Sequence, residues 1–276
     1  MKIFKKIIIL LIILILTPVG VYFYSRHIEP NLLTIKKYDV QVPEGVSKSK
    51  IVFFSDTHFG KMYDQSNIEK IVKKINSQNP DIVIFGGDFL DNYARDLSSL
   101  DLEYLSSNLD SIKAKYGKYA ILGNHDYGGG AIKVYSNIMN LGGFSVIKND
   151  NVFIDKLGIK LIGFDDLLMG YTDPSLYSIK SEDFNIILSH EPDVVNKINL
   201  KNYGFMLSGH SHGGQVSLPY VTEKVLPDGA KEYLKGKYNN VGINNNIDLF
   251  VSKGIGMTSV PFRLFNVPQI VVLELK

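Results

Sequence analysis

Short apolar runs that end in polar motifs dominate this sequence. The runs are Ile51–Phe54, Ile82–Phe85, Tyr119–Leu122, Phe184–Leu188 and Phe205–Leu207. Their length and composition are typical of buried strands. In open α/β sheets, the loops that follow the carboxyl ends of strands converge on one edge, where ligands bind. The pattern therefore predicts alternating strands and helices, with the chemistry gathered at that edge.

The segments between these runs complete an α/β pattern. Ile68, Ile71, Val72 and Ile75 recur with helical spacing, and further helices are expected over Leu97–Ile112 and Ile132–Met139. More strands are expected at Phe144–Ile147, Val152–Ile154, Ile159–Phe164, Leu249–Ser252 and Ile270–Leu275. Strands alternate with helices early and follow one another directly later. We predict two mixed β-sheets flanked by helices, a four-layer αββα sandwich.

The polar motifs consist of residue types that bind metal ions. They are Ser55-Asp56-Thr57-His58, Gly86-Gly87-Asp88-Phe89-Leu90-Asp91, Gly123-Asn124-His125-Asp126, Ser189-His190-Glu191-Pro192 and Gly209-His210-Ser211-His212. The chain has no cysteine, which excludes disulfides, thiolate zinc sites and cysteine nucleophiles. Asp, His and Asn are suitable ligands for manganese, iron, zinc or magnesium. Taken alone, most of these motifs are equally typical of helix caps, turns or structural histidines, but their conjunction at strand ends favours a metal site.

The overall charge argues against one class of function. Lys and Arg total 30 and Asp and Glu total 28, so the formal net charge is only +2. A dedicated nucleic-acid-binding protein usually carries a strongly basic face. We therefore expect no nucleic-acid-binding surface.

The amino terminus is predicted to be a membrane anchor. Residues Ile7 to Tyr24 contain no charged side chain, and these 18 residues are just enough for a helix to cross a bilayer. Tyr22, Phe23 and Tyr24 suit the membrane interface. The alternatives are a cleaved signal peptide, which would release a secreted protein, and a core helix, which the lack of a polar face disfavours. Three lysines precede the span and Arg26 follows it, so we expect a single-pass protein of the cell membrane with the rest of the chain on the extracytoplasmic side.

These features divide the chain into three parts. Residues 1–26 are expected to form the anchor, and residues 27–49 a linker and a first strand around Ile35–Val42. Residues 50–276 are expected to form one catalytic domain, since no further boundary or repeat is visible.

The ordered motifs D-x-H, G-D-x-x-D, G-N-H-D, a later H and G-H-x-H resemble those of the calcineurin-like metallophosphoesterase superfamily. The resemblance spans Ile51 to Gly214, and Asp126 stands where many members have Glu. The anchor, Gly209–Gln215 and Ser259–Arg263 look like the bacterial membrane-associated, phosphodiesterase-like members. The resemblance to the superfamily implies a metallophosphoesterase domain.

The resemblance also implies a role for each motif residue. Asp56, His58 and His212 would hold one metal ion, Asn124, His190 and His210 a second, and Asp88 would bridge them. The expected cofactors are two divalent ions, with manganese favoured over iron or zinc. His125 is the candidate for protonating the leaving oxygen or binding the phosphate, and Asp91 is the candidate for orienting it. Asp126 is expected to support its loop and to bind no metal.

Physical reasoning supports a phosphoester substrate. Two cations about 3.5–4 Å apart repel each other, so a shared carboxylate and a bridging hydroxide are needed between them. We expect hydrolysis of phosphodiester or pyrophosphate bonds, on lipid-linked or envelope substrates. The alternatives are a phosphomonoesterase, a phosphoprotein phosphatase, or a non-catalytic metal-binding scaffold. The sequence indicates neither the native substrate nor the oligomeric state.

Overall fold

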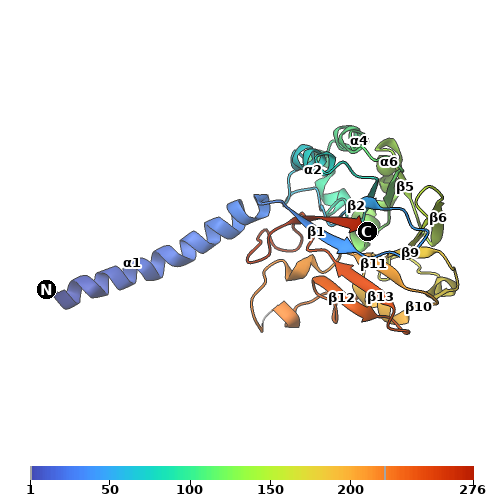
Figure 1. The fold of residues 1–276 in the computed structure, drawn as a ribbon. Coiled ribbons are helices and arrows are strands. Elements are labelled where there is room, and N and C mark those ends of the chain that lie inside the picture. The colour runs from blue at the N-terminus through green and yellow to red at the C-terminus, as the bar shows by residue number, and fades with distance from the viewer. Residues whose placement is uncertain (1, 221) are drawn as a thin grey trace.

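A long amino-terminal helix stands apart from the rest of the protein (Figure 1). The computed structural model describes residues 2–220 and 222–276. Helix α1 spans Lys2–Phe23, has no buried residue, and continues through a π-helical turn, Tyr24–Ile28, into a 3-10 turn, Glu29–Asn31. Within the described residues, this segment is long and apolar enough to cross a membrane. It coincides with the predicted anchor.

The first large sheet has the strand order β1-β14-β2-β3-β4-β5. Its strands are β1 (Thr34–Val40), β2 (Ser49–Phe54), β3 (Ile82–Phe85), β4 (Lys118–Ala120), β5 (Phe144–Val146) and β14 (Gln269–Leu275). β14 runs antiparallel to β2, and all other neighbours are parallel. The strand after the anchor is therefore paired with the last strand of the chain.

The second large sheet has the order β12-β13-β11-β9-β7-β6. Its strands are β6 (Asp150–Ile154), β7 (Ile159–Gly163), β9 (Phe184–Leu188), β11 (Gly204–Ser208), β12 (Gly236–Val241) and β13 (Ile247–Val251). The central strands are parallel and both edge strands are antiparallel. β8 (Ser178–Ile179) and β10 (Asn199–Leu200) form a separate small sheet.

Apolar side chains on both faces of the sheets create the layers. The helices α2 (Asn67–Asn76), α4 (Leu102–Asp110) and α6 (Ile132–Leu141) cover the outer face of the first sheet (Figure 1). A second apolar cluster fills the space between the sheets, and a third lies against the 3-10 helix Pro192–Lys197. The predicted fold class, two mixed sheets flanked by helices, is confirmed.

One predicted helix was wrong in its extent. The segment Leu97–Ile112 is not continuous: α3 (Tyr93–Asp96) and a 3-10 turn end at an extended Leu100, and α4 then begins. Asp101 causes the new start because its side chain accepts a hydrogen bond from the amide of Tyr104 at 2.9 Å. The prediction failed because the helical spacing of apolar residues continues across Asp101, although this residue caps a second helix.

The layer between the sheets should dominate stability. Leu161 on β7 is fully buried there, whereas Leu97 is 51% exposed. We expect Leu161→Ala to lower the free energy of unfolding by about 2–5 kcal/mol, because it leaves a cavity between two sheets. Leu97→Ala is the matched control and should change it by less than about 0.5 kcal/mol. Denaturant unfolding of the full chain in detergent measures both, and equal effects would contradict this account of the core.

Candidate metal centre

All the predicted metal-binding motifs lie at one edge of the fold. Asp56 follows β2, Asp88 follows β3 and Asn124 follows β4 in the first sheet, while His190 and His210 follow β9 and β11 in the second. These strands are parallel within each sheet, so their carboxyl ends face the same way. Except for Asn124 and His125, the predicted site residues are buried. The two sheets therefore contribute to a single site.

The predicted ligands form two overlapping groups, and a third group joins His58 to Asp91 and His125. Ligand atoms of Asp56, His58, Asp88 and His212 lie within 4.8 Å of one another, and so do those of Asp88, His190 and His210. Asp88 is in both groups, because its Oδ2 lies 3.3 Å from His58 Nε2 and 3.1 Å from His190 Nε2. Asn124 joins the second group through Oδ1, 3.1 Å from His210 Nδ1. The structure thus brings together all seven predicted ligands.

Hydrogen bonds to main-chain carbonyls around the cluster set the orientation of two imidazole rings. His190 Nδ1 lies 2.7 Å from the carbonyl of Gly86, and His210 Nε2 lies 2.8 Å from the carbonyl of Asp228. A carbonyl only accepts, so each of these nitrogens carries a hydrogen. The other ring nitrogen then faces the cluster and, once it has lost its own proton, can bind a cation there, as in metal sites.

The histidines of the cluster differ in the direction in which their pKa values are shifted. Burial acts to lower the pKa of His58, but Asp88 and Asp91 outweigh it and raise the pKa to about 9. His190 is likewise held well above its usual pKa, against burial, chiefly by Asp88. The pKa of His212 lies well below its usual range because of burial and the nearby His58.

This balance fits divalent cations. His212 Nε2 points at His58 Nε2 from 2.9 Å, so two nitrogens converge on one place that needs a proton or a cation. The buried Nε2 of His190 has no hydrogen-bond partner in the described part of the chain, although Asp88 is close. Imidazole and carboxylate ligands of this kind suit manganese, iron or zinc.

Asp91 contacts both His58 and His125, in an unexpected way. The Nδ1 of His125 donates to the main-chain carbonyl of Asp91 at 2.7 Å and lies 3.7 Å from its carboxylate. The carboxylate is closer to His58 Nδ1, at 3.2 Å, and pairs with Arg95 at 2.5 Å. Asp91 can therefore orient His125 through its backbone and His58 through its side chain.

Asp126 supports the loops around the site. Its carboxylate accepts hydrogen bonds from the amides of Asp88 at 2.7 Å, Phe89 at 2.8 Å and Gly123 at 2.9 Å. It lies in neither ligand group. The prediction that Asp126 stabilises its loop is confirmed.

The backbone at the ligands is strained. Asp56, His58, Asp88, His210 and His212 all have left-handed φ values between +44° and +65°. Such conformations cost free energy in non-glycine residues and cluster at functional sites. Beside them, Gly87 has φ +92°, and a Cβ there would lie 2.8 Å from His190 Nδ1. The chain accepts this strain in order to direct side chains from separate loops at one point.

A cavity of about 450 Å³ opens above the cluster. Asp88, Asn124, His125, His210 and His212 line its base. Its rim consists of Val225–Pro227 and Thr258–Val260, and sequence reasoning assigned neither segment to the site. Only the resemblance of Ser259–Arg263 to a family segment pointed there.

Arg263 has a structural position that the sequence did not reveal. Its guanidinium is fully buried and donates to the carbonyls of Lys253, Gly256 and Asn266 at 2.7–3.0 Å. Burial lowers its pKa to about 10. It thereby fixes the rim loop close to His212, whose Nδ1 is 3.4 Å away.

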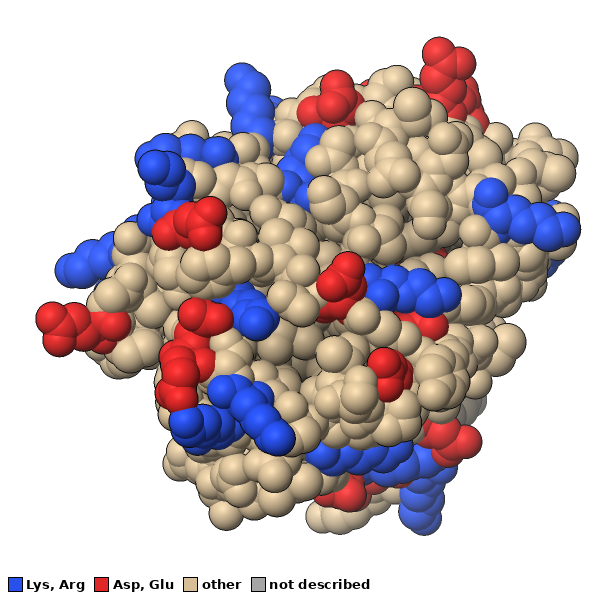
Figure 2. Space-filling view, turned by 90° about the vertical axis from the view of Figure 1, so that its right-hand side faces the viewer, with Lys and Arg blue, Asp and Glu red and all other residues tan. Residues whose placement is uncertain are grey.

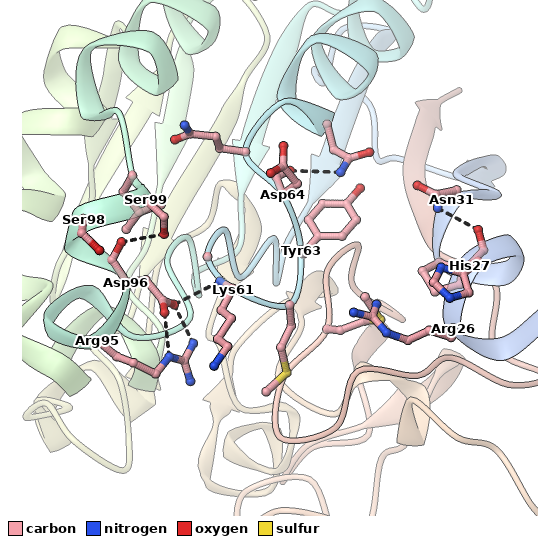
Figure 3. A pocket seen from close by; sticks show the side chains of 17 residues that line it. Arg26, His27, Asn31, Lys61, Tyr63, Asp64, Arg95, Asp96, Ser98 and Ser99 are labelled. Atoms are coloured by element: carbon pink, nitrogen blue, oxygen red, sulfur yellow. Dashed lines mark hydrogen bonds and ion pairs between the residues drawn. The ribbon is translucent and has the colours of Figure 1, made fainter. Parts of the chain in front are cut away.

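A larger cavity of about 660 Å³ lies beside the anchor (Figure 3). Arg26 from the end of the anchor, Lys61 from the loop after β2 and Arg95 from helix α3 line it. None of the predicted metal ligands does. The metal site is therefore in the smaller cavity.

Comparisons with known proteins agree with this geometry. A family model described as calcineurin-like phosphoesterase matches residues 49–214. The metallophosphoesterase YkuE of Bacillus subtilis is 33% identical over 272 residues, covering 95% of this chain and 92% of the relative. A metallophosphoesterase of Aquifex aeolicus is 29% identical, covering 91% and 94%. The UDP-2,3-diacylglucosamine pyrophosphatase LpxG of Chlamydia muridarum is 26% identical, covering 95% and 94%.

The family model covers more than half of the chain, and the similarity to the Bacillus relative extends over almost all of both proteins. The chain therefore belongs to the calcineurin-like phosphoesterase family and is a metal-dependent phosphoester hydrolase.

Proposed function

We propose that this protein is a membrane-anchored enzyme with two divalent cations that hydrolyses phosphodiester or pyrophosphate bonds. The sharing of Asp88 by two ligand groups beneath one cavity carries the proposal. When bound, two such cations neutralise phosphate oxygens and lower the pKa of the attacking water. Manganese is our favoured metal, with iron and zinc as alternatives.

The residues have distinct proposed roles. One cation is assigned to Asp56, His58 and His212, the other to Asn124, His190 and His210, and Asp88 is shared. His125 lines the cavity, and its Nδ1 hydrogen is committed to the Asp91 carbonyl. Its Nε2, when it carries a hydrogen as well, is then the atom that can give a proton to the leaving oxygen. Asp91 is a positioning residue for His58 and His125.

We propose a lipid-linked or envelope phosphate as the substrate. Two observations support this: α1 is suited to a bilayer, and a relative that aligns over 94% of its own length is named a UDP-2,3-diacylglucosamine pyrophosphatase. Residues 1–26 would be the anchor, 27–49 a linker with β1, and 50–276 the catalytic domain. Lys2, Lys5 and Lys6, in the first turns of α1 before its uncharged stretch, favour an extracytoplasmic catalytic domain.

The shared carboxylate gives the most direct test. We expect the full chain to hold about two manganese ions, and Asp88→Asn to hold fewer, since the charge between the cations is lost. Hydrolysis of bis-p-nitrophenyl phosphate should fall at least roughly 100-fold. Metal analysis and steady-state kinetics measure both effects.

Two further variants control this test. Asp110→Asn changes an aspartate whose side chain is 71% exposed, and it should change neither quantity. His125→Gln should keep both ions but lose about 10²–10⁴-fold in kcat, as expected for a proton donor. Full turnover and full metal content in Asp88→Asn would show that the site is wrongly assigned.

Metal affinity should depend on pH. We expect the affinity for Mn²⁺ to fall as the pH is lowered from about 9 to about 6. Each cation must displace protons from rings whose pKa is raised, to about 9 for His58 and well above the usual value for His190. Calorimetry in buffers of different ionisation enthalpy should show proton release on binding. An affinity that stays constant over this range would contradict the assigned ligands.

The bond that is cleaved can be identified by comparing three substrates. We expect UDP-2,3-diacylglucosamine, a lipid-linked pyrophosphate, to give a higher kcat/KM than bis-p-nitrophenyl phosphate or p-nitrophenyl phosphate. The reason is that remote lipid contacts supply binding energy for the reaction. A preference for the monoester would instead favour a phosphomonoesterase or phosphoprotein phosphatase.

A further inference from the structure

The loop that borders the metal cavity is fastened to the end of the anchor. The amide of Arg263 donates to the carbonyl of Ser25 at 2.9 Å, and the amide of Phe265 donates to the Glu29 carboxylate at 3.0 Å. Glu29 is almost fully buried and also accepts from the amide of Asn266. The rim loop 258–266 and the base of the anchor thus form one connected unit.

An aromatic contact sets the level of this loop along the anchor. The ring of Tyr22, in the last turn of α1, packs edge-on against Phe262, with 5.5 Å between centroids. As a helix, the uncharged residues Ile7–Phe23 rise about 25 Å. That length is close to the hydrocarbon thickness of a bilayer, ~30 Å. If α1 spans a bilayer, Tyr22 and Phe262 both lie at the membrane interface, where aromatic rings are favoured.

The loops at this level expose large apolar side chains. Phe265 is 69% exposed and Val260 is 44% exposed on the rim loop, and Val225 is 71% exposed on the facing loop, residues 222–228. Val225 and Val260 line the same cavity, so the two loops are neighbours. The rim loop has no exposed charge, because its one charged residue is the buried Arg263, whereas the facing loop also exposes the charged side chains of Glu223, Lys224 and Asp228 beside Val225. Apolar groups gathered in this way mark an interaction surface.

The opposite face of the protein has a different character. Both loops lie on the side from which α1 leaves the body (Figure 1). Figure 2 shows the far side, where positive and negative side chains are interspersed among uncharged ones, as on an ordinary water-exposed surface. The apolar loop tips thus lie on the side where the anchor would meet a membrane.

The larger cavity lies slightly farther from the membrane. Arg26, four residues after Tyr22, is about 6 Å farther along the helix. Arg95 is paired with Asp91 and Asp96, whereas no carboxylate in residues 2–220 and 222–276 forms a salt bridge with Arg26 or Lys61. Cations at this depth face the lipid phosphates, and apolar groups below them face the acyl chains.

We propose that loops 222–228 and 258–266 form a docking surface that rests in the outer interfacial layer of the bilayer spanned by α1. The docking surface surrounds the opening of the metal cavity, so the active site opens at the lipid surface. A lipid-linked phosphate can then reach the cations without leaving the membrane. This proposal rests on the proposed anchoring by α1 and deepens the proposed choice of substrate.

The absence of tryptophan allows a direct test. The chain contains no Trp, so each introduced Trp is the sole probe. We would reconstitute the full chain with Tyr22→Trp, Val225→Trp, Phe265→Trp or Phe153→Trp in vesicles of phosphatidylcholine with brominated acyl chains, which add no tryptophan of their own. Bromine quenches Trp fluorescence only at short range. Phe153, 45% exposed on β6 at the side away from α1, is the matched control (Figure 1).

We expect the probes at 22, 225 and 265 to lose most of their fluorescence, and the probe at 153 to lose almost none. Quenching at 22 without quenching at 225 and 265 would overturn the docking surface but leave the anchor intact. No quenching at 22 would overturn both. Because the readout is independent of turnover, its failure is distinct from failure of the proposed enzyme activity.

A second variant connects docking to catalysis. Phe265 is exposed and does not line the metal cavity, so Phe265→Glu should fold and leave hydrolysis of soluble bis-p-nitrophenyl phosphate unchanged. Turnover of UDP-2,3-diacylglucosamine in nanodiscs should fall roughly tenfold, since burying a Phe side chain in the lipid favours docking by at least that factor. Equal turnover of this lipid by the unmodified protein and by Phe265→Glu would contradict the proposal.

Discussion

The negative charge of Asp88 organises the whole metal site. Its carboxylate faces His58 from the first sheet and His190 from the second, and the protonation of both rings depends on it. Two hydrogen bonds fix the position of Asp88. Its amide donates to the Asp126 carboxylate, and its Oδ1 accepts from the amide of His125 at 2.8 Å. A carboxylate held in this way between two groups of ligands is what the proposed pair of cations would require.

Much of this arrangement could be predicted from the sequence. The strands, the fold class and the convergence of the seven ligands follow from apolar runs that end in Asp, His and Asn motifs. The helix break at Asp101 was missed because apolar spacing continues across it. The contacts that orient His190, His210 and His125 were also missed. They use main-chain carbonyls, which any residue can supply, so they leave no mark in the sequence.

The relation between anchor and site is a tertiary feature. Arg263, Phe265 and Asn266 are more than 230 positions from Ser25 and Glu29, yet they meet at the end of α1. β1 and β14 bring these segments together by pairing in parallel over seven residue pairs. The position of the rim relative to the anchor is therefore built into the sheet itself and does not depend on a flexible linker. Hydropathy alone predicts that the chain is anchored. The pairing of β1 with β14 determines which loops lie next to the anchor.

The left-handed backbone at five of the ligands limits how this protein could evolve. Asp, Asn and His tolerate that conformation better than other side chains, glycine tolerates it freely, and β-branched residues do not. A descendant that lost its chemistry but kept its fold would thus be expected to carry Asn or Gly at Asp56, Asp88 or His210, and not Val or Thr. Inactive relatives should be recognisable by small, turn-compatible substitutions at these positions, because the left-handed backbone restricts the residue type even when no metal is bound.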